Sequence, residues 1–424
     1  MRNPIGITGL GIVSSIGENV TEFESSLLSG RSGICESPEN IKSETSVKIG
    51  AFIKNFSFND AINRFSGYND SLLQRAAKST RRSPFFVQAS VLAALEAWGN
   101  AGLNQKNMDP YRIGIIVAGS NLTQRLQYEQ TLKSAKYPQL TLPSYATQHM
   151  DTNLLSILSE VFQVYGEGFT VGGASASGNV AIIKALQLIQ MNELDTCIVV
   201  GSLADLSPIE LQSFYNVGAL GGRIYADRPR RACRPFDKNH EGFIFGQASG
   251  CLIVESVNNV KVRGINPMAT ILSGSILLDG NSLANPTEEG ETKVMELALK
   301  KAGLTCRDVD YINAHGTSSP LGDQTELSAI KAVFKENIKK IWINSTKPLT
   351  GHCLQAAGVI EAISTVIQLN KNFLHANINL DQPMDQGFKF VGKKSCKAQL
   401  DVAMSNSFGF GGINTSILIK KGES

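Results

Sequence analysis

Four residues with the capacity for catalysis lie in short segments rich in glycine, serine and threonine. Ser175 lies in Gly173-Ala-Ser-Ala-Ser-Gly178, and His315 lies in Asn313-Ala-His-Gly-Thr317. Lys347 and His352 share the segment Ser345-Thr-Lys-Pro-Leu-Thr-Gly-His352. Neutral imidazole N–H groups can stabilise negative charge that develops on an oxygen atom during a reaction. Each histidine comes shortly after a strand-like run and lies next to a glycine in a segment that contains threonine. This setting favours a catalytic over a structural role for both.

Ser175 stands at the predicted start of a buried helix. Gly172-Gly173-Ala174 predicts a tight turn, and the residues from Val180 to Ile189 are apolar nearly all round. The partial positive charge of a helix N-terminus stabilises a nearby anion by about 0.3–1 kcal/mol. This stabilisation favours a thiolate but is too weak to ionise a hydroxyl. A serine nucleophile therefore needs a positioned base, and the Gly-x-Ser-x-Gly elbow is absent here. Two interpretations stay open: Ser175 caps the helix and positions backbone, or it forms a covalent bond.

These segments occur in the order and spacing of a known family. With Ile7-Thr-Gly-Leu-Gly-Ile-Val-Ser14, Arg234-Pro-Phe-Asp-Lys-Asn-His-Glu-Gly-Phe243 and the terminal Asn406-Ser-Phe-Gly-Phe-Gly-Gly412, the chain resembles the ketosynthases of the thiolase superfamily over nearly its whole length. Those enzymes carry a cysteine at the position of Ser175. A deliberate Cys→Ser change would leave the same residue. The preceding Gly-Gly, and Gln247 and Ser249 where the family usually has Glu and Ala, favour a natural branch instead.

The resemblance implies a role for each matching residue. The histidine pair would contact the thioester carbonyl and promote loss of carbon dioxide from a malonyl group, while Lys347 would orient the histidines. The amides of Phe410 and residue 175 would form an oxyanion hole, and the Phe410 ring would gate the pocket. Asp323, Glu326 and Glu361 would complete a buried polar network, with structural ion pairing as the alternative. The residues implied to bind the substrate or its phosphopantetheine arm are Thr317, Ser319, Phe243, Phe408 and Gly409.

Short β-branched runs alternate with longer helical segments, which predicts an α/β protein with mainly parallel, buried strands. The expected strands cover residues 5–10, 113–117, 197–200, 250–254 and 309–312, and the expected helices 83–101, 180–191 and 288–302. Residues 112–120 look like residues 309–317, which suggests an internal duplication. The resemblance adds a thiolase-like fold of two duplicated halves stacked as five alternating α-β-α-β-α layers. We expect the halves to span residues 1–258, with Ser175, and 259–424, with His315, Lys347 and His352.

Composition narrows the possible classes of function. The chain has 424 residues, 42% hydrophobic and 18% charged, as in a globular protein with a large core. A net charge of +3 gives little reason to expect nucleic acid or an anionic membrane as partner. Seven scattered cysteines without a Cys-x-x-Cys pair, and five histidines without metal-ligand spacing, predict no metal site and fit a reducing cytoplasm. His149, His240 and His375 match no catalytic motif.

The missing thiol and the retained histidines together suggest a function. Condensation needs an active-site thiol that accepts an acyl group, and this chain lacks it. An enolate formed from malonyl-acyl carrier protein would instead be protonated to acetyl-acyl carrier protein, as in the ketosynthase-like decarboxylases of polyketide β-branching cassettes. The alternatives are a serine-dependent acyltransferase or condensing enzyme, and a non-catalytic partner resembling a chain-length factor. The resemblance also implies a phosphopantetheine arm supplied by the carrier protein, no permanently bound cofactor, and a homodimer joined through residues 197–200.

Overall fold

The strands of the protein fall into two groups with the same spatial order. The computed structural model describes residues 4–105, 108–281 and 285–422. Within them, eleven strands form one sheet in the order β12-β10-β9-β14-β15-β8-β1-β7-β6-β4-β5. The strands of the first group are β1 (Ile5–Ser14), β4 (Ile113–Ala118), β5 (Gly168–Val171), β6 (Thr196–Gly201) and β7 (Ala248–Ser256). Those of the second are β8 (Ala269–Leu278), β9 (Tyr311–Asn313), β10 (Trp342–Asn344), β14 (Val402–Gly409) and β15 (Ile413–Lys421).

Numbered by their order along the chain, the five strands of each group are arranged 3-2-4-5-1. In the first group this is β5-β4-β6-β7-β1, and in the second it is β10-β9-β14-β15-β8. The fifth strand, β7 or β15, runs antiparallel to both of its neighbours. Strands β4 and β9 are the second strands of their halves, so the likeness of residues 112–120 to residues 309–317 reflects a real duplication. The two groups meet where β1 pairs with β8 over Ile5 to Ile7.

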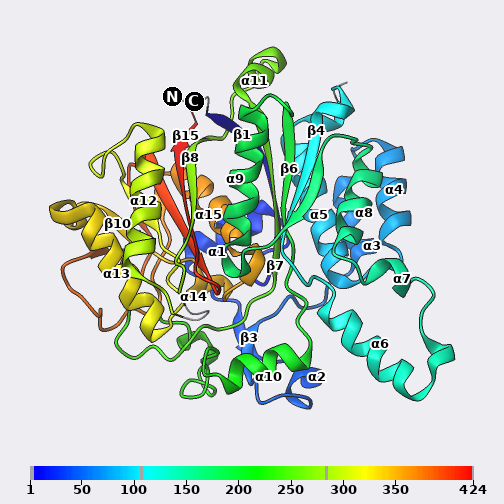
Figure 1. Ribbon diagram of the computed structural model, residues 1–424, viewed down its shortest axis with the longest axis horizontal. Coiled ribbons are helices and arrows are strands. Elements are labelled where there is room, and N and C mark those ends of the chain that lie inside the picture. The colour runs from blue at the N-terminus through cyan, green and yellow to red at the C-terminus, as the bar shows by residue number, and fades with distance from the viewer. Residues whose placement is uncertain (1–3, 106–107, 282–284, 423–424) are drawn as a thin grey trace.

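The halves stack in the five expected layers. Helices α9 (Ser177–Gln190) and α15 (Ala357–Lys371) lie in the middle and contact strands of both groups. Helices α5 (Phe85–Asn100) and α8 (Thr152–Phe162) cover the outer face of the first group. Helices α12 (Glu288–Ala302) and α13 (Pro320–Phe334) lie outside the second group (Figure 1). The thiolase-like α/β architecture is therefore confirmed.

Two expectations about the strands were wrong. Five of the ten pairings in the large sheet are antiparallel, so its strands are not mainly parallel. The segment 197–200 lies in β6, which pairs with β4 on one side and β7 on the other. An interior strand has no free backbone groups left to extend the sheet to a second copy. The strand at this end of the sheet is β5, which pairs with β4 alone within the described residues.

The expected helices are present with small shifts at their ends. Residues 83–101 form α5, residues 180–191 belong to α9, and residues 288–302 form α12. A helix of seven residues, α11 (Val257–Arg263), links β7 to β8 and hence the two halves. The division at residues 258 and 259 stays a prediction. The remaining α-helices are α1 (Val20–Ser29), α2 (Glu39–Lys42), α3 (Phe58–Ile62), α4 (Asp70–Thr80), α6 (Gln124–Lys136), α7 (Tyr145–Gln148), α10 (Pro208–Asn216) and α14 (Lys347–Thr350).

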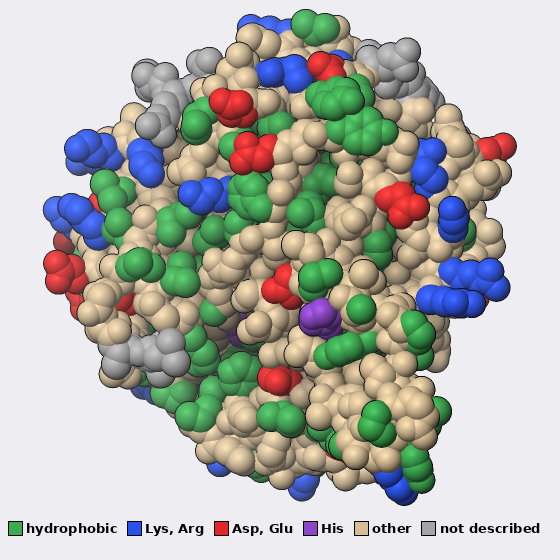
Figure 2. All heavy atoms as spheres, turned by 45° about the vertical axis from the view of Figure 1, so that its right-hand side comes forward, with side chains coloured by type: hydrophobic (Ala, Val, Ile, Leu, Met, Phe, Trp, Pro, Cys, Tyr) green, Lys and Arg blue, Asp and Glu red, His purple; other side chains and the backbone are tan. Residues whose placement is uncertain are grey.

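Five short strands complete the described structure. Strand β12 (Lys389–Phe390) extends the second group beyond β10. The others form two small two-stranded sheets, β2 (Ile34–Glu36) with β3 (Ile49–Ala51), and β11 (Phe373–Leu374) with β13 (Cys396–Lys397). Among the described residues, no helix has the length and apolar character needed to cross a membrane. Figure 2 shows one face of the molecule on which basic side chains lie in separate groups, with acidic side chains between them.

Candidate active site

Ser175 lies in a single 3₁₀ turn, Ala174–Ala176, that precedes α9. Ala174 adopts a left-handed conformation with a φ of 47°, which is uncommon for a residue with a Cβ atom. The sequence suggested that Gly172 and Gly173 form the tight turn, but neither glycine has a positive φ. The left-handed residue of the turn is Ala174. Gly409 packs directly against this turn: a Cβ there would lie 2.4 Å from the Gly173 carbonyl oxygen. The terminal motif thus fixes the turn that presents Ser175.

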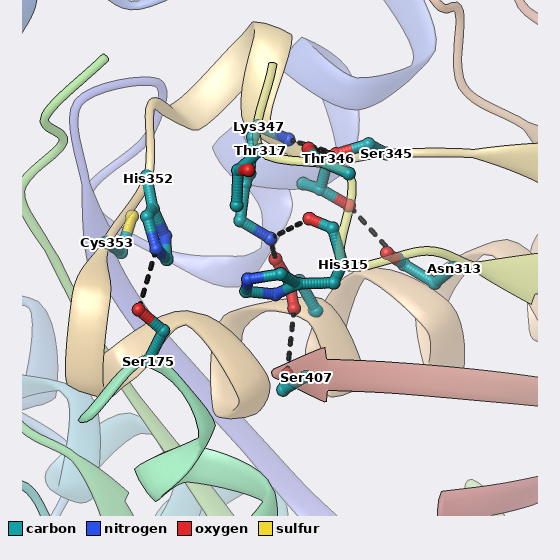
Figure 3. Close-up of polar contacts among 12 residues, drawn as sticks. Ser175, Asn313, His315, Thr317, Ser345, Thr346, Lys347, His352, Cys353 and Ser407 are labelled. Atoms are coloured by element: carbon teal, nitrogen blue, oxygen red, sulfur yellow. Dashed lines mark hydrogen bonds and ion pairs between the residues drawn. The ribbon is translucent and has the colours of Figure 1, made fainter. Parts of the chain in front are cut away.

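The Ser175 side chain contacts His352 and does not cap α9. Its Oγ lies 2.9 Å from His352 Nε2 (Figure 3). Helix α9 begins without any side-chain cap hydrogen bond, so the capping interpretation of Ser175 was wrong. His352 is buried and follows α14, with its backbone N–H bonded to the Ile244 carbonyl. The hydroxyl and the imidazole come from opposite halves of the chain.

His315 faces the same space from the end of β9. Its ring lies 5.5 Å from the His352 ring, centroid to centroid, at an interplanar angle of 83°. The Glu326 carboxylate holds the loop by accepting the backbone N–H groups of His315 at 2.8 Å and Gly316 at 2.7 Å. Burial raises the pKa of Glu326 to about 7, and these two N–H groups oppose that rise. Figure 3 shows Ser175 and both imidazoles pointing toward a common space.

The surroundings of both histidines favour the neutral form of the imidazole ring. Burial lowers the pKa of each imidazole well below its usual range, and the nearby Lys347 ammonium lowers it further. The Nδ1 atom of each ring is buried without a hydrogen-bond partner among the described residues. A buried N–H donor without an acceptor is rarer and more unfavourable than an unpaired acceptor. The favoured tautomer of each ring therefore carries its proton on Nε2, and His352 donates to the Ser175 oxygen.

Lys347 is bound behind the histidines and does not reach their rings. Its Nζ pairs with the Glu361 carboxylate and donates to the His315 carbonyl oxygen. Lys347 and Glu361 are only 1% and 2% exposed, so the ion pair is fully withdrawn from water. Ser407 donates to the second Glu361 oxygen at 3.3 Å. Lys347 thus holds His315 through a hydrogen bond to its backbone, while no hydrogen bond joins Lys347 to His352 among the described residues.

Asp323 supports the loop that follows His315. Its carboxylate accepts the backbone N–H groups of Thr317 at 3.0 Å and Ser318 at 3.1 Å. It also lies 3.3 Å from Nδ1 of His240, a residue that matched no catalytic motif. Of the three predicted network acids, only Glu361 pairs with a lysine or arginine among the described residues, while Asp323 and Glu326 accept backbone amides.

Aromatic rings enclose the histidines. Phe243 lies edge-on to His352 at 5.2 Å between ring centroids, and Phe408 lies edge-on to His315 at 5.7 Å. Phe410 is 45% exposed and approaches Phe214 of α10, which also contacts Phe243. Phe214 was not anticipated from the sequence, because a lone phenylalanine in a helix gives no sign of which distant ring it meets. Thr317 and Ser319 share a hydrogen bond of 2.8 Å on the loop after His315.

Comparisons with known proteins match the chain throughout. The N-terminal domain model of β-ketoacyl synthase matches residues 2–259, and the C-terminal domain model matches residues 268–381. A Bacillus subtilis protein called polyketide biosynthesis malonyl-ACP decarboxylase is 40% identical over 98% of this chain and 95% of its own. The Coxiella burnetii 3-oxoacyl-[acyl-carrier-protein] synthase 2 is 31% identical, covering 99% of both chains. The crystal structure of a β-ketoacyl synthase from Burkholderia phymatum superposes with a TM-score of 0.87 at 27% identity, covering 99% of both chains.

Proposed function

Because the chain belongs to the β-ketoacyl synthase family, we propose that it is an enzyme that converts malonyl-acyl carrier protein to acetyl-acyl carrier protein. One observation carries this proposal: the histidine pair and its lysine are intact around a serine that replaces the condensing thiol. The similarity to the Bacillus subtilis protein of that name supports it and points to polyketide biosynthesis, in a β-branching cassette.

The proposed reaction breaks the bond between the malonyl C2 atom and its carboxyl carbon. Carbon dioxide leaves, and the electron pair becomes an enolate whose charge lies on the thioester oxygen. The substrate oxygen would take over the Nε2–H that His352 donates to Ser175 in the free protein, and the Nε2–H of His315 would be the second donor. Such preorganised donors lower the barrier. Phe243 and Phe408 line the same space with apolar edges. A carboxylate held there loses hydration, whereas carbon dioxide does not need it, so this environment favours decarboxylation.

The carrier protein would supply the only prosthetic group, its phosphopantetheine arm. Thr317 and Ser319 offer two adjacent hydroxyls to that arm on the loop that follows His315. The half-exposed Phe410 ring stands at the outer side of the pocket, next to Phe214. The close packing of Gly409 on the Ser175 turn supports an oxyanion hole made from the amides of Phe410 and Ser175. The proposed reaction uses no resident cofactor or metal, and the acyl carrier protein is the proposed macromolecular substrate.

A homodimer remains part of the proposal, with a different strand at its centre. The edge strand β5 has one neighbour in the described sheet and leads directly into the turn of Ser175. Antiparallel pairing of β5 with its copy would extend the sheet across a two-fold axis, as an isologous contact. Sedimentation at micromolar concentration should give twice the chain mass of 45.7 kDa, and a monomer would contradict the dimer.

The rival functions are less well supported by this geometry. A serine acyltransferase would need His315 or His352 as base, and the 2.9 Å contact of His352 with Ser175 is the observation in its favour. However, His352 Nδ1 has no carboxylate partner among the described residues, and burial lowers the pKa of its ring. Both features weaken an imidazole as a base. An inert partner like a chain-length factor would have no need of the buried Lys347–Glu361 pair behind the histidines.

The direct test uses the pure protein and malonyl-acyl carrier protein. Mass spectrometry of the carrier should show conversion of the malonyl to the acetyl form without any added partner. A malonyl thioester that stays intact for hours at high enzyme concentration would refute decarboxylation. A stable mass shift on Ser175 after incubation with acyl donors would favour the acyltransferase.

A further inference from the structure

We propose that the Ser175 hydroxyl delivers the proton that converts the enolate carbon into the methyl group of the product. The proposal rests on the proposed decarboxylation and names the acid that completes it. It assigns Ser175 the role of proton donor in place of nucleophile or helix cap. The reaction requires such a donor, because the electron pair that loss of carbon dioxide leaves on carbon must accept a proton to give the acetyl product.

The direction of the hydrogen bond between Ser175 and His352 supports this role. One contact of 2.9 Å can serve two opposite functions, depending on which atom donates. If Ser175 donated to Nε2, His352 would carry its proton on Nδ1, where no partner lies among the described residues. With the proton on Nε2, His352 donates to the serine oxygen. The Ser175 proton then stays free for the substrate.

The other acidic groups around the pocket are engaged elsewhere. The Lys347 ammonium is bonded to the Glu361 carboxylate and to the His315 carbonyl oxygen, behind the rings. The Glu326 oxygens accept the backbone N–H groups of His315 and Gly316. Ser175 instead lies partly exposed on its turn, in contact with His352. It can therefore meet the substrate carbon and regain a proton from water after each turnover.

The proposed step balances in atoms and charge. The Oγ–H bond of Ser175 breaks as the enolate electron pair forms a C–H bond at C2. The thioester carbonyl is restored, and the negative charge moves from its oxygen to the serine oxygen. The Nε2–H of His352 can follow that charge, since it already reaches Oγ. A solvent proton then returns Ser175 to its neutral form.

The experiment separates carbon dioxide loss from proton delivery. Wild type, Ser175→Ala and Ser175→Thr are incubated with malonyl-acyl carrier protein in buffer rich in isotopically labelled carbon dioxide. Released carbon dioxide reports cleavage, and label in the remaining malonyl group reports an enolate that waits long enough to be recarboxylated. We expect Ser175→Ala to release carbon dioxide within about tenfold of the wild-type rate and to accumulate label in malonyl. Wild type and Ser175→Thr, which keep the hydroxyl, should accumulate none.

Each outcome decides between the two hypotheses. Carbon dioxide release from none of the three proteins would refute the decarboxylase itself. Normal acetyl formation without label in Ser175→Ala would refute only the proton donor, as would equal labelling of Ser175→Thr. Nitrogen NMR of His352 gives an independent check of the direction of the hydrogen bond on which the proposal rests. A proton on Nε2 supports the proposal, and a proton on Nδ1 overturns it.

Discussion

The two halves of the molecule use one architecture for unequal tasks. In each half a 3₁₀ turn with a left-handed residue precedes the central helix: Ala174 with a φ of 47° before α9, and Leu354 with a φ of 49° before α15. The two helices touch at Gly178 and Gly358, where a Cβ on Gly178 would lie 2.6 Å from the backbone nitrogen of Val359. By this correspondence Ser175 matches Gln355 in the other half.

The halves differ in the segments that connect the third strand to the central helix. In the first half, β5 ends at residue 171 and the 3₁₀ turn starts at residue 174. In the second half, residues 345–353 separate β10 from the corresponding turn, and they carry both Lys347 and His352. The segment after the second strand differs as well, since His315-Gly-Thr stands where the first half has Ala118-Gly-Ser. The candidate catalytic groups Lys347, His352 and His315 therefore lie in or next to these connections, while the order of the strands and the central helices is common to both halves.

The buried ion pair of the second half gives the largest expected effect. Lys347→Met leaves the Glu361 carboxylate buried without its cation. The free energy of unfolding should fall by about 3–5 kcal/mol, as measured by urea denaturation. Adding Glu361→Gln removes the stranded charge and should recover most of that loss. Equal instability of the single and double variants would show that the pair stabilises the site by packing alone.

Recovered stability should not bring back full activity in that double variant. A methionine side chain has no N–H group, so the His315 carbonyl oxygen loses the hydrogen bond that Lys347 donates to it. The stable double variant should therefore still form acetyl-acyl carrier protein more slowly than wild type. This result would separate the positioning role of Lys347 from its contribution to folding.

The histidine pair should dominate the chemistry of the second half. His315→Ala or His352→Ala removes one donor from the enolate oxygen, which should cost at least about 2.7 kcal/mol in the barrier, or about a hundredfold in rate. The rate of acetyl-acyl carrier protein formation measures this effect, with His149→Gln as a control at a histidine away from the pocket. If carbon dioxide release by Ser175→Ala fell as far as that of the histidine variants, the serine would act as a unit with them in the cleavage step, and the acyltransferase would gain support.

A thiol at position 175 should allow the protein to accept an acyl group covalently, which the Ser175 hydroxyl is not expected to do. Ser175→Cys places a readily ionised group at the same turn, near the positive end of α9. After incubation with an acyl thioester, the variant should carry an acyl group on the cysteine at this position, detected by peptide mass spectrometry. Wild type treated in the same way should carry none. An unmodified thiol would mean that the turn does not favour the thiolate.

The positions of the main strands and helices could be predicted from the local sequence, because buried strands and helices need continuous apolar runs. The runs at residues 113–117 and 250–254 lie within β4 and β7. Strand order is set by packing between distant segments, so the interior place of β6 could not be predicted from residues 197–200. The family motifs predicted that Ser175, His315 and His352 share one site, and the structure places them close together. The left-handed Ala174 and the contact of His240 with Asp323 depend on distant backbone and left no local signal.

Substitution of Gln355, the residue that corresponds to Ser175 in the second half, should give the smallest effect. Gln355 occupies the matching turn, and its side chain lies against Gly119, where a Cβ would approach Gln355 Cγ to 3.1 Å. The residue of the first half that corresponds to His315 is Ala118, so the turn of Gln355 has no histidine in the place that His315 takes for Ser175. Gln355→Ala should therefore leave the rate of acetyl-acyl carrier protein formation within about twofold, as surface or partly buried changes outside a site usually do. A loss comparable to that of His352→Ala would show that the turn before α15 also contributes to the reaction, and the assignment of different tasks to the two halves would then be wrong.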